Sequence, residues 1–134
     1  MNAKDLVATY IEEVWNCGNL AALSDLTAPG FTYHLGGQPP RDFAGMEQFL
    51  VGTREAFPDW RVTVESIVSD ESLVAVRWSG EVTHLGLFHG APATGKKVSV
   101  SGINLYRIEG GKVAQEWEQM DSLGMLGQLG ILPT

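Results

Sequence analysis

Residues 97–121, KVSVSGINLYRIEGGKVAQEWEQMD, have the pattern of two β-strands joined by a tight hairpin. The turn falls on Glu109-Gly110-Gly111-Lys112, because glycine readily adopts the backbone conformations that a short hairpin requires. Successive side chains of a strand point to opposite faces, so alternate residues of the second strand are predicted to share one face: Val113, Gln115, Trp117, Gln119 and Asp121. If that face covers a core, Asp121 ends an apolar row, and burial there would raise the pKa of its carboxyl.

Helical patterns dominate the N-terminal half of the chain. Six residues follow the spacing of one helical face: Ala3, Leu6, Val7, Tyr10, Ile11 and Val14. We expect a shorter helix from Leu20 to Leu26 and a strand over Phe31–Leu35. A third helix should end near Phe57, because Pro58 disfavours the helical conformation in the residue before it.

Strand patterns occupy the remainder. Trp60–Val68 alternates, and Leu73–His84 forms a longer strand in which Gly80 suggests a bend or a bulge. A loop follows from Gly86 to Gly95, and Ser122–Gln128 has the pattern of a last helical turn. Helices grouped before mostly antiparallel strands predict an α+β fold. We expect one domain over residues 1–134, a cone-shaped barrel in which a strongly curved sheet wraps over the N-terminal helices and encloses one small apolar ligand.

Composition narrows the class of protein. The chain has 134 residues, of which 44% are hydrophobic and 19% charged. A chain of this length and composition can bury a sizeable hydrophobic core. A net charge of −7 argues against nucleic acid as a partner, because a phosphate backbone would be repelled. No apolar run is long enough for a membrane span and the N-terminus lacks the pattern of a signal peptide, so we expect a cytoplasmic protein.

Metal and cofactor motifs are not evident. The only cysteine is Cys17, and the histidines at positions 34, 84 and 89 lack the spacing of metal ligands. No glycine-rich loop has the context for phosphate or dinucleotide binding. We therefore expect chemistry without a metal or an organic cofactor.

Several segments together resemble a known family. They are Phe57-Pro58-Asp59-Trp60, the loop from Thr83 to Gly95, Tyr106-Arg107-Ile108, Gly111-Lys112-Val113, Glu116-Trp117, Asp121 and Gln128-Leu129-Gly130. This combination resembles the SnoaL-like polyketide cyclases, also called ester cyclases, which have the cone fold of the nuclear-transport-factor-two-like superfamily. The resemblance extends over nearly the whole chain.

The resemblance implies a reaction and two site residues. The family's chemistry is an intramolecular aldol closure of a polyketide ester, in which an aspartate is the acid/base and histidines polarise the substrate carbonyl. Asp121 occupies the position of that aspartate, and His34 resembles the family's histidine near the pocket. Asn104-Leu105-Tyr106-Arg107 stands where the cyclases carry a further histidine.

Other residues are candidates for the pocket wall. The predicted substrate-binding residues are Gln119, Asn104, Trp117, Tyr106, His84, Trp15 and Phe49. Aromatic residues in such patterns more often belong to the core, although core residues near the mouth of a cone also line its cavity. Asp121 is also compatible with a strand-end cap at Ser122. His84 either reaches the pocket or anchors the loop from Gly86 to Gly95, while Arg54 is expected to face solvent.

We therefore expect an enzyme that performs acid/base chemistry on a small apolar carbonyl compound, with Asp121 as the base. Two alternatives remain open. One is an epoxide hydrolase or isomerase-type relative in which the acid activates water, and the other is a non-catalytic domain that binds small molecules. A homodimer is expected, because a chain of this size leaves the outer face of its sheet open.

Overall fold

The chain begins with three helical segments in a row, which together are called the helical arm. In the computed structural model, which describes residues 1–131, α1 (Ala3–Tyr10) continues directly into η1 (Ile11–Asn16), and α2 (Leu20–Leu26) follows. Asn2 caps α1 by accepting a hydrogen bond from the backbone N–H of Asp5 at 2.8 Å. In η1 the turn widens to a π-helix, in which the backbone N–H of Cys17 bonds the carbonyl of Glu12.

The remaining elements are one more long helix, a sheet and a short last helix: β1 (Thr27–Leu35), α3 (Phe43–Ala56), β2 (Thr63–Ser69), β3 (Leu73–Thr83), β4 (Lys97–Glu109), β5 (Lys112–Met120) and α4 (Ser122–Leu129). Within residues 1–131 the strands form one sheet in the order β1-β5-β4-β3-β2. The β1–β5 pair is parallel and the other pairs are antiparallel. The predicted α+β class is confirmed.

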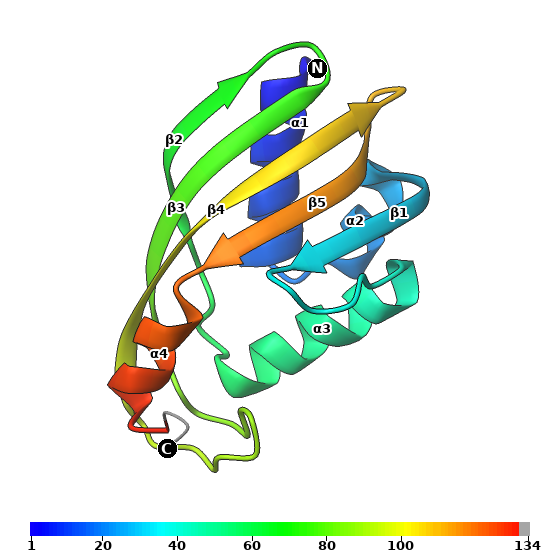
Figure 1. Cartoon of the computed structure of the whole chain (residues 1–134). Coiled ribbons are helices and arrows are strands. Elements are labelled where there is room, and N and C mark those ends of the chain that lie inside the picture. The colour runs from blue at the N-terminus through cyan, green and yellow to red at the C-terminus, as the bar shows by residue number, and fades with distance from the viewer. Residues whose placement is uncertain (132–134) are drawn as a thin grey trace.

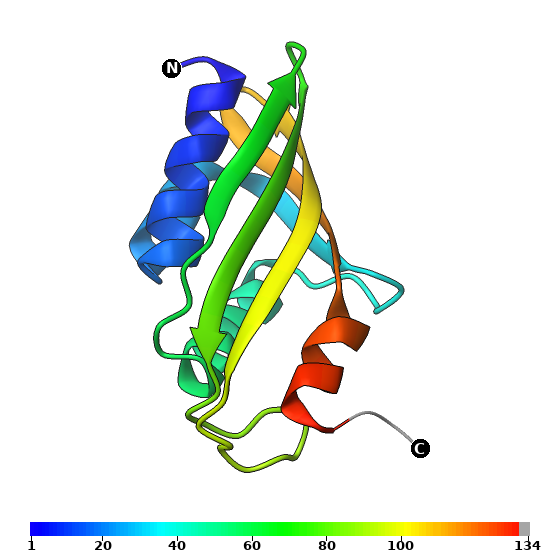
Figure 2. The same ribbon diagram turned by 90° about the vertical axis from the view of Figure 1, so that its left-hand side faces the viewer.

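The sheet curves around the N-terminal helices. α1 lies against its concave side and α3 crosses below it near β1, as the two views in Figures 1 and 2 show. The core between these layers is apolar and aromatic, with Val7, Tyr10, Val14, Tyr33 and Met46 all fully buried. The concave side of the sheet is therefore the inside of the molecule, and only residues on that side reach a central site.

A β-bulge near the start of β5 reverses which residues face inward. Ile108 of β4 pairs with Val113, but Arg107 pairs with Gln115, so Ala114 is an extra residue without a partner on β4. Val113 and Ala114 are both buried, and after them Glu116 and Glu118 point inward. The predicted inward row ending in Trp117, Gln119 and Asp121 is therefore wrong.

Gly80 has another role than the predicted bulge. β3 and β4 pair without a register shift through Gly80, which lies opposite Val100. A Cβ atom at Gly80 would come within 2.5 Å of the carbonyl oxygen of Arg61. Glycine is thus required here because the segment leading into β2 passes directly against the strand.

α4 extends the chain past the end of the sheet. Gly130 ends this helix in the left-handed conformation, with φ +75°.

None of the helices described in residues 1–131 combines the length and the apolar character that crossing a membrane requires.

Candidate functional site

A small cavity lies inside the cone, between the helical arm and the concave side of the sheet. Its lining comes from five places in the sequence: Ile11 and Trp15 of η1, Trp60 and Val62 before β2, Trp78 of β3, Asn104 and Tyr106 of β4, and Glu118 of β5. The lining is mostly apolar, and its polar groups are the carboxyl of Glu118, the amide of Asn104, the hydroxyl of Tyr106 and the indole N–H groups. Its free space is close to the size of one water molecule.

Glu116 is fully buried and hydrogen-bonded on several sides. Its carboxyl accepts hydrogen bonds from Tyr10 Oη at 2.7 Å, Trp15 Nε1 at 2.9 Å and Asn104 Nδ2 at 2.8 Å. Burial raises the pKa of Glu116, although these hydrogen bonds act in the opposite direction. The residue links the helical arm to the sheet, and it does not line the cavity.

Glu118 is the acid that lines the cavity. Its side chain accepts a hydrogen bond from Tyr33 Oη at 2.8 Å and a longer one from Asn104 Nδ2 at 3.3 Å. Burial is the largest cause that raises the pKa of Glu118 to about 7, and the nearby carboxyl of Glu116 is the second. The hydrogen bonds from Tyr33 and Asn104 and the charge of Arg41 lower the pKa, but by less. A carboxyl with this pKa can both accept and donate a proton near neutral pH.

Asn104 connects the two acids and has a defined orientation. Trp78 Nε1 donates to Asn104 Oδ1 at 2.8 Å, and an indole nitrogen can only donate. The amide nitrogen of Asn104 must therefore face Glu116 and Glu118, to which it donates. Both ends of the amide are engaged, so Asn104 positions the two carboxyls.

The tyrosines of this network remain protonated. Burial and the neighbouring carboxyls raise the pKa of Tyr10, Tyr33 and Tyr106 well above the usual value. Tyr10 and Tyr33 are thus hydrogen-bond donors to Glu116 and Glu118 over the whole range of physiological pH.

The acid that the sequence predicted as the base lies elsewhere. Asp121 is exposed and is the N-cap of α4, where its side chain accepts a hydrogen bond from the backbone N–H of Gly124 at 2.9 Å. The predicted burial of Asp121 at the end of an apolar row is wrong. Gln119 is exposed as well, because the bulge at Ala114 turns it to the outer face.

His34 and Trp117 also lie on the outer face of the sheet. Their rings stack at 5.4 Å between centroids, and Thr32 Oγ1 lies 3.0 Å from the His34 ring. Since β1 and β5 pair with His34 beside Trp117, both side chains leave the sheet on the side opposite the cavity. The predicted pocket positions of His34 and Trp117 are wrong.

Three of the predicted wall residues do line the cavity, namely Trp15, Asn104 and Tyr106. Phe49 packs behind the wall, with its ring 6.2 Å from Trp15 and 5.4 Å from Tyr33. His84 is buried away from the cavity and anchors the following loop, because the backbone N–H of Thr94 donates to its Nδ1 at 3.3 Å. For His84 the structure thus bears out the loop-anchoring alternative.

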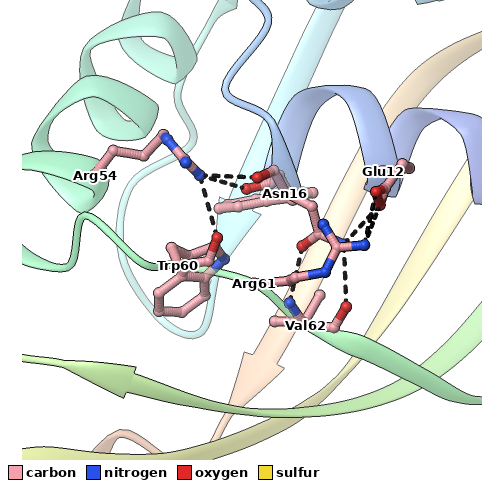
Figure 3. Close-up of polar contacts among 7 residues, drawn as sticks. Glu12, Asn16, Arg54, Trp60, Arg61 and Val62 are labelled. Atoms are coloured by element: carbon pink, nitrogen blue, oxygen red, sulfur yellow. Dashed lines mark hydrogen bonds and ion pairs between the residues drawn. The ribbon is translucent and has the colours of Figure 1, made fainter.

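Arg54 is a structural residue rather than a solvated one. Its Nη1 donates to the backbone carbonyls of Trp15, Asn16 and Trp60, each at 3.2 Å (Figure 3). The backbone N–H of Val62 donates to Asn16 Oδ1 at 2.8 Å, and Asn16 Nδ2 donates to the carbonyl of Val62 at 3.0 Å. These contacts hold η1 and the segment Trp60–Val62 together, and so they define one side of the cavity.

The sequence contained two signals for the residues that were missed. Two consecutive apolar residues, Val113 and Ala114, interrupt the alternation of β5, which is a mark of a bulge. Tyr10 lies on the predicted buried face of the first helix, and a buried tyrosine hydroxyl usually requires a polar partner. That partner is Glu116.

Within residues 1–131, no three histidine, cysteine or acidic side chains gather as they would around a metal ion.

Comparison with known proteins agrees with the cone fold. The family model described as SnoaL-like polyketide cyclase matches residues 5–129. The search found no match among curated proteins.

Solved structures with the same fold cover nearly the whole chain. IdmH, a proposed polyketide cyclase from Streptomyces antibioticus, is 34% identical over 94% of this chain and 96% of its own, with a TM-score of 0.82. A proposed polyketide cyclase from Acidithiobacillus ferrooxidans is 30% identical over 94% and 92%, with a TM-score of 0.83. AclR, a proposed hydroxylase from Streptomyces galilaeus, is 28% identical over 98% and 87%, with a TM-score of 0.84. With its family match over residues 5–129 and its cone fold, the chain belongs to the SnoaL-like polyketide cyclase family.

Proposed function

We propose that this protein catalyses acid/base chemistry at a small apolar carbonyl compound, with Glu118 as the base. The observation that carries this proposal is a buried carboxyl, with its pKa raised to about 7, in the wall of a mostly apolar cavity. A general base is most effective when its pKa is near the working pH, and Glu118 meets that condition. Membership in a family of polyketide cyclases supports a reaction of this class.

The proposed reaction starts with proton abstraction. The ionised carboxylate of Glu118 removes a proton from the carbon next to a ketone or ester, and the electron pair of the broken C–H bond forms an enolate. In a cyclase-type reaction the enolate carbon bonds to a second carbonyl carbon of the same molecule. The alkoxide formed there takes the proton back from Glu118, so the enzyme returns to its starting state. Positioning by Tyr33 and Asn104 keeps the carboxyl in one place throughout.

The size of the cavity limits the substrate. The free space is close to one water molecule, so a ligand with a carbon skeleton enters only if side chains of the wall move. Most of the wall consists of indole rings and aliphatic chains, from Ile11, Trp15, Trp60, Val62 and Trp78. The proposal is therefore for a compact, uncharged carbonyl compound, since an anion would meet both an apolar wall and the carboxyl of Glu118.

Deuterium exchange tests the proposal without knowledge of the natural substrate. Small ketones and esters are incubated with the protein in deuterated buffer, and loss of the α-proton signal is followed by NMR. We expect catalysed exchange that Glu118→Gln abolishes, because glutamine keeps the shape of the side chain and cannot accept the proton. Glu81→Gln, an exposed acid of β3, is the control for loss of one negative charge. Equal exchange rates for the Glu118→Gln variant and the unmodified protein contradict Glu118 as the base.

A second candidate function is water activation, as in hydrolysis of an epoxide. The observation that favours it is the pair of inward acids, Glu116 and Glu118, bridged by Asn104 beside a space that fits one water molecule. In that reaction Glu118 takes a proton from water, the water oxygen bonds to an epoxide carbon as the C–O bond to the ring oxygen breaks, and the alkoxide formed takes the proton back from Glu118 to give a diol. Incubation with small epoxides in ¹⁸O-labelled water separates the two functions, because only the hydrolase places the label in its product.

A further inference from the structure

Trp60 has a buried hydrogen-bond donor without an acceptor. The residue is 6% exposed, and its Nε1 has no hydrogen-bond partner among residues 1–131. The other two indoles of the cavity wall are satisfied, since Trp15 Nε1 donates to Glu116 and Trp78 Nε1 donates to Asn104. Trp60 is therefore the one tryptophan of the wall whose N–H group is free in this part of the chain.

An unpaired buried N–H is unfavourable, because the group has lost its hydrogen bonds to water without replacement. The backbone of Trp60 nonetheless holds the residue firmly in place. Its N–H donates to the carbonyl of Phe57 at 2.9 Å, and its carbonyl accepts from Arg54 at 3.2 Å (Figure 3). The rings of Phe57, Trp15 and Trp78 surround the indole, with centroids 6.2 to 6.4 Å away. The main chain of Trp60 is therefore held in place and its indole is packed among rings, while its N–H group is left available to a ligand.

The acid side of the cavity has no comparable free donor. Both ends of the Asn104 amide are engaged, the hydroxyl of Tyr33 donates to Glu118, and the hydroxyl of Tyr106, the other polar group of this wall, is hydrogen-bonded with Glu116. A carbonyl compound that places its α-carbon near Glu118 requires a donor for its oxygen, because negative charge gathers on that oxygen as the enolate forms. Among the indole groups of the wall, Trp60 can supply it.

We infer that Trp60 binds the oxygen of the ligand, and that it donates its indole N–H to a ketone, ester or epoxide oxygen in the cavity. This inference rests on the proposed function for the identity of the ligand, in which Glu118 is the base. An uncharged acceptor fits the site, whereas a carboxylate would be opposed by Glu118. A hydrocarbon of the same shape would fill the cavity and leave the Trp60 N–H unpaired, so the site should prefer the oxygen-containing ligand.

The test compares cyclohexanone with methylenecyclohexane, which has the same shape and no acceptor oxygen. Both are titrated into ¹⁵N-labelled protein, and the indole N–H signals are followed by NMR, with that of Trp60 assigned from the Trp60→Phe variant. We expect cyclohexanone to move the Trp60 proton downfield as a hydrogen bond forms, and the hydrocarbon to cause no such shift. Absence of a downfield shift at saturating ketone overturns the inference.

Two variants separate ligand binding from structural support. Trp60→Phe removes a donor that has no acceptor in the described chain, whereas Trp78→Phe removes the same ring volume and a hydrogen bond to Asn104. We expect Trp60→Phe to lower the urea midpoint less than Trp78→Phe. We also expect it to weaken cyclohexanone binding by about fivefold to tenfold more than binding of the hydrocarbon, as for one neutral hydrogen bond. An equal loss for both ligands, or a greater loss of stability than in Trp78→Phe, assigns Trp60 to the core.

The binding experiment does not depend on turnover. If Glu118→Gln abolishes exchange while Trp60→Phe leaves ketone binding intact, the base is correct and the inference about Trp60 fails. If Trp60 shifts with ketone while Glu118→Gln leaves exchange unchanged, the binding site is correct and the proposed base fails.

Discussion

Replacing Glu118 by glutamine should change how the stability of the protein depends on pH. Because the folded-state pKa of Glu118 is raised, from 4.5 to about 7, the folded protein holds this proton more tightly than the unfolded chain does. The associated stabilisation is fully present below about pH 4.5 and is lost as the pH rises to about 7. The protein should therefore become less stable with rising pH over this window.

The size of the effect follows from the same pKa values. Each tenfold change in proton affinity corresponds to about 1.4 kcal/mol, so a rise from 4.5 to about 7 corresponds to about 3 kcal/mol. Of this, about 2.5 kcal/mol falls between pH 5 and pH 8. Glu118 is only 4% exposed, so solvent screening reduces this figure little. Glutamine cannot ionise, and its variant should lack this part of the pH dependence.

Urea unfolding at pH 5, 6, 7 and 8 measures the difference. We expect the free energy of unfolding of the unmodified protein to fall by about 2.5 kcal/mol more between pH 5 and pH 8 than that of Glu118→Gln. Glu81→Gln, at an exposed position of β3, is the matched control for removal of one carboxyl. Parallel pH profiles for the Glu118→Gln variant and the unmodified protein would refute both the raised pKa and the argument that Glu118 can act as a base at neutral pH.

The remaining predictions concern other parts of the molecule. Asp121→Asn should leave deuterium exchange unchanged and cost only a few tenths of a kcal/mol, because asparagine caps a helix as well as aspartate does; loss of exchange would restore Asp121 as the base. Gly102→Ala should lower the free energy of unfolding by about 1–3 kcal/mol, since its Cβ would lie 2.7 Å from the carbonyl oxygen of Gln119, while Gly37→Ala, with open space around it, should cost much less in the same urea titration. We also propose that two copies of the chain pair through the outer face of the sheet, which would bury Ile103, a residue 55% exposed in the single chain. Ile103→Lys should then shift sedimentation velocity profiles toward the monomer, and an unchanged profile would place the interface elsewhere.

The local patterns of the sequence predicted the elements well. The apolar spacing from Ala3 to Val14 identifies the first helix and its buried face, and Pro58 correctly places the end of the third helix next to Phe57. Glu109-Gly110-Gly111-Lys112 identifies the hairpin between β4 and β5. These features depend on neighbours in the chain, and so the sequence carries them directly.

The candidate site was predicted only in part. Trp15, Asn104 and Tyr106 were expected in the cavity wall and lie there. Glu118 was assigned to the outer face because strict alternation was followed through Ala114. One extra residue inverts every later side chain of a strand, so a single local error exchanged an exposed acid for a buried one.

From the sequence alone one can derive the helices, the hairpins, the α+β class and an aromatic interior, because each depends on periodicity or on residues close together in the chain. Only the tertiary structure decided which carboxyl is buried and which indole lacks a partner. The bulge at Ala114 is defined by pairing with β4, and the pKa of Glu118 depends on Tyr33, Asn104 and Glu116 from three strands. Burial and hydrogen bonding at this site are properties of residues that meet only in space, and no spacing within one segment encodes them.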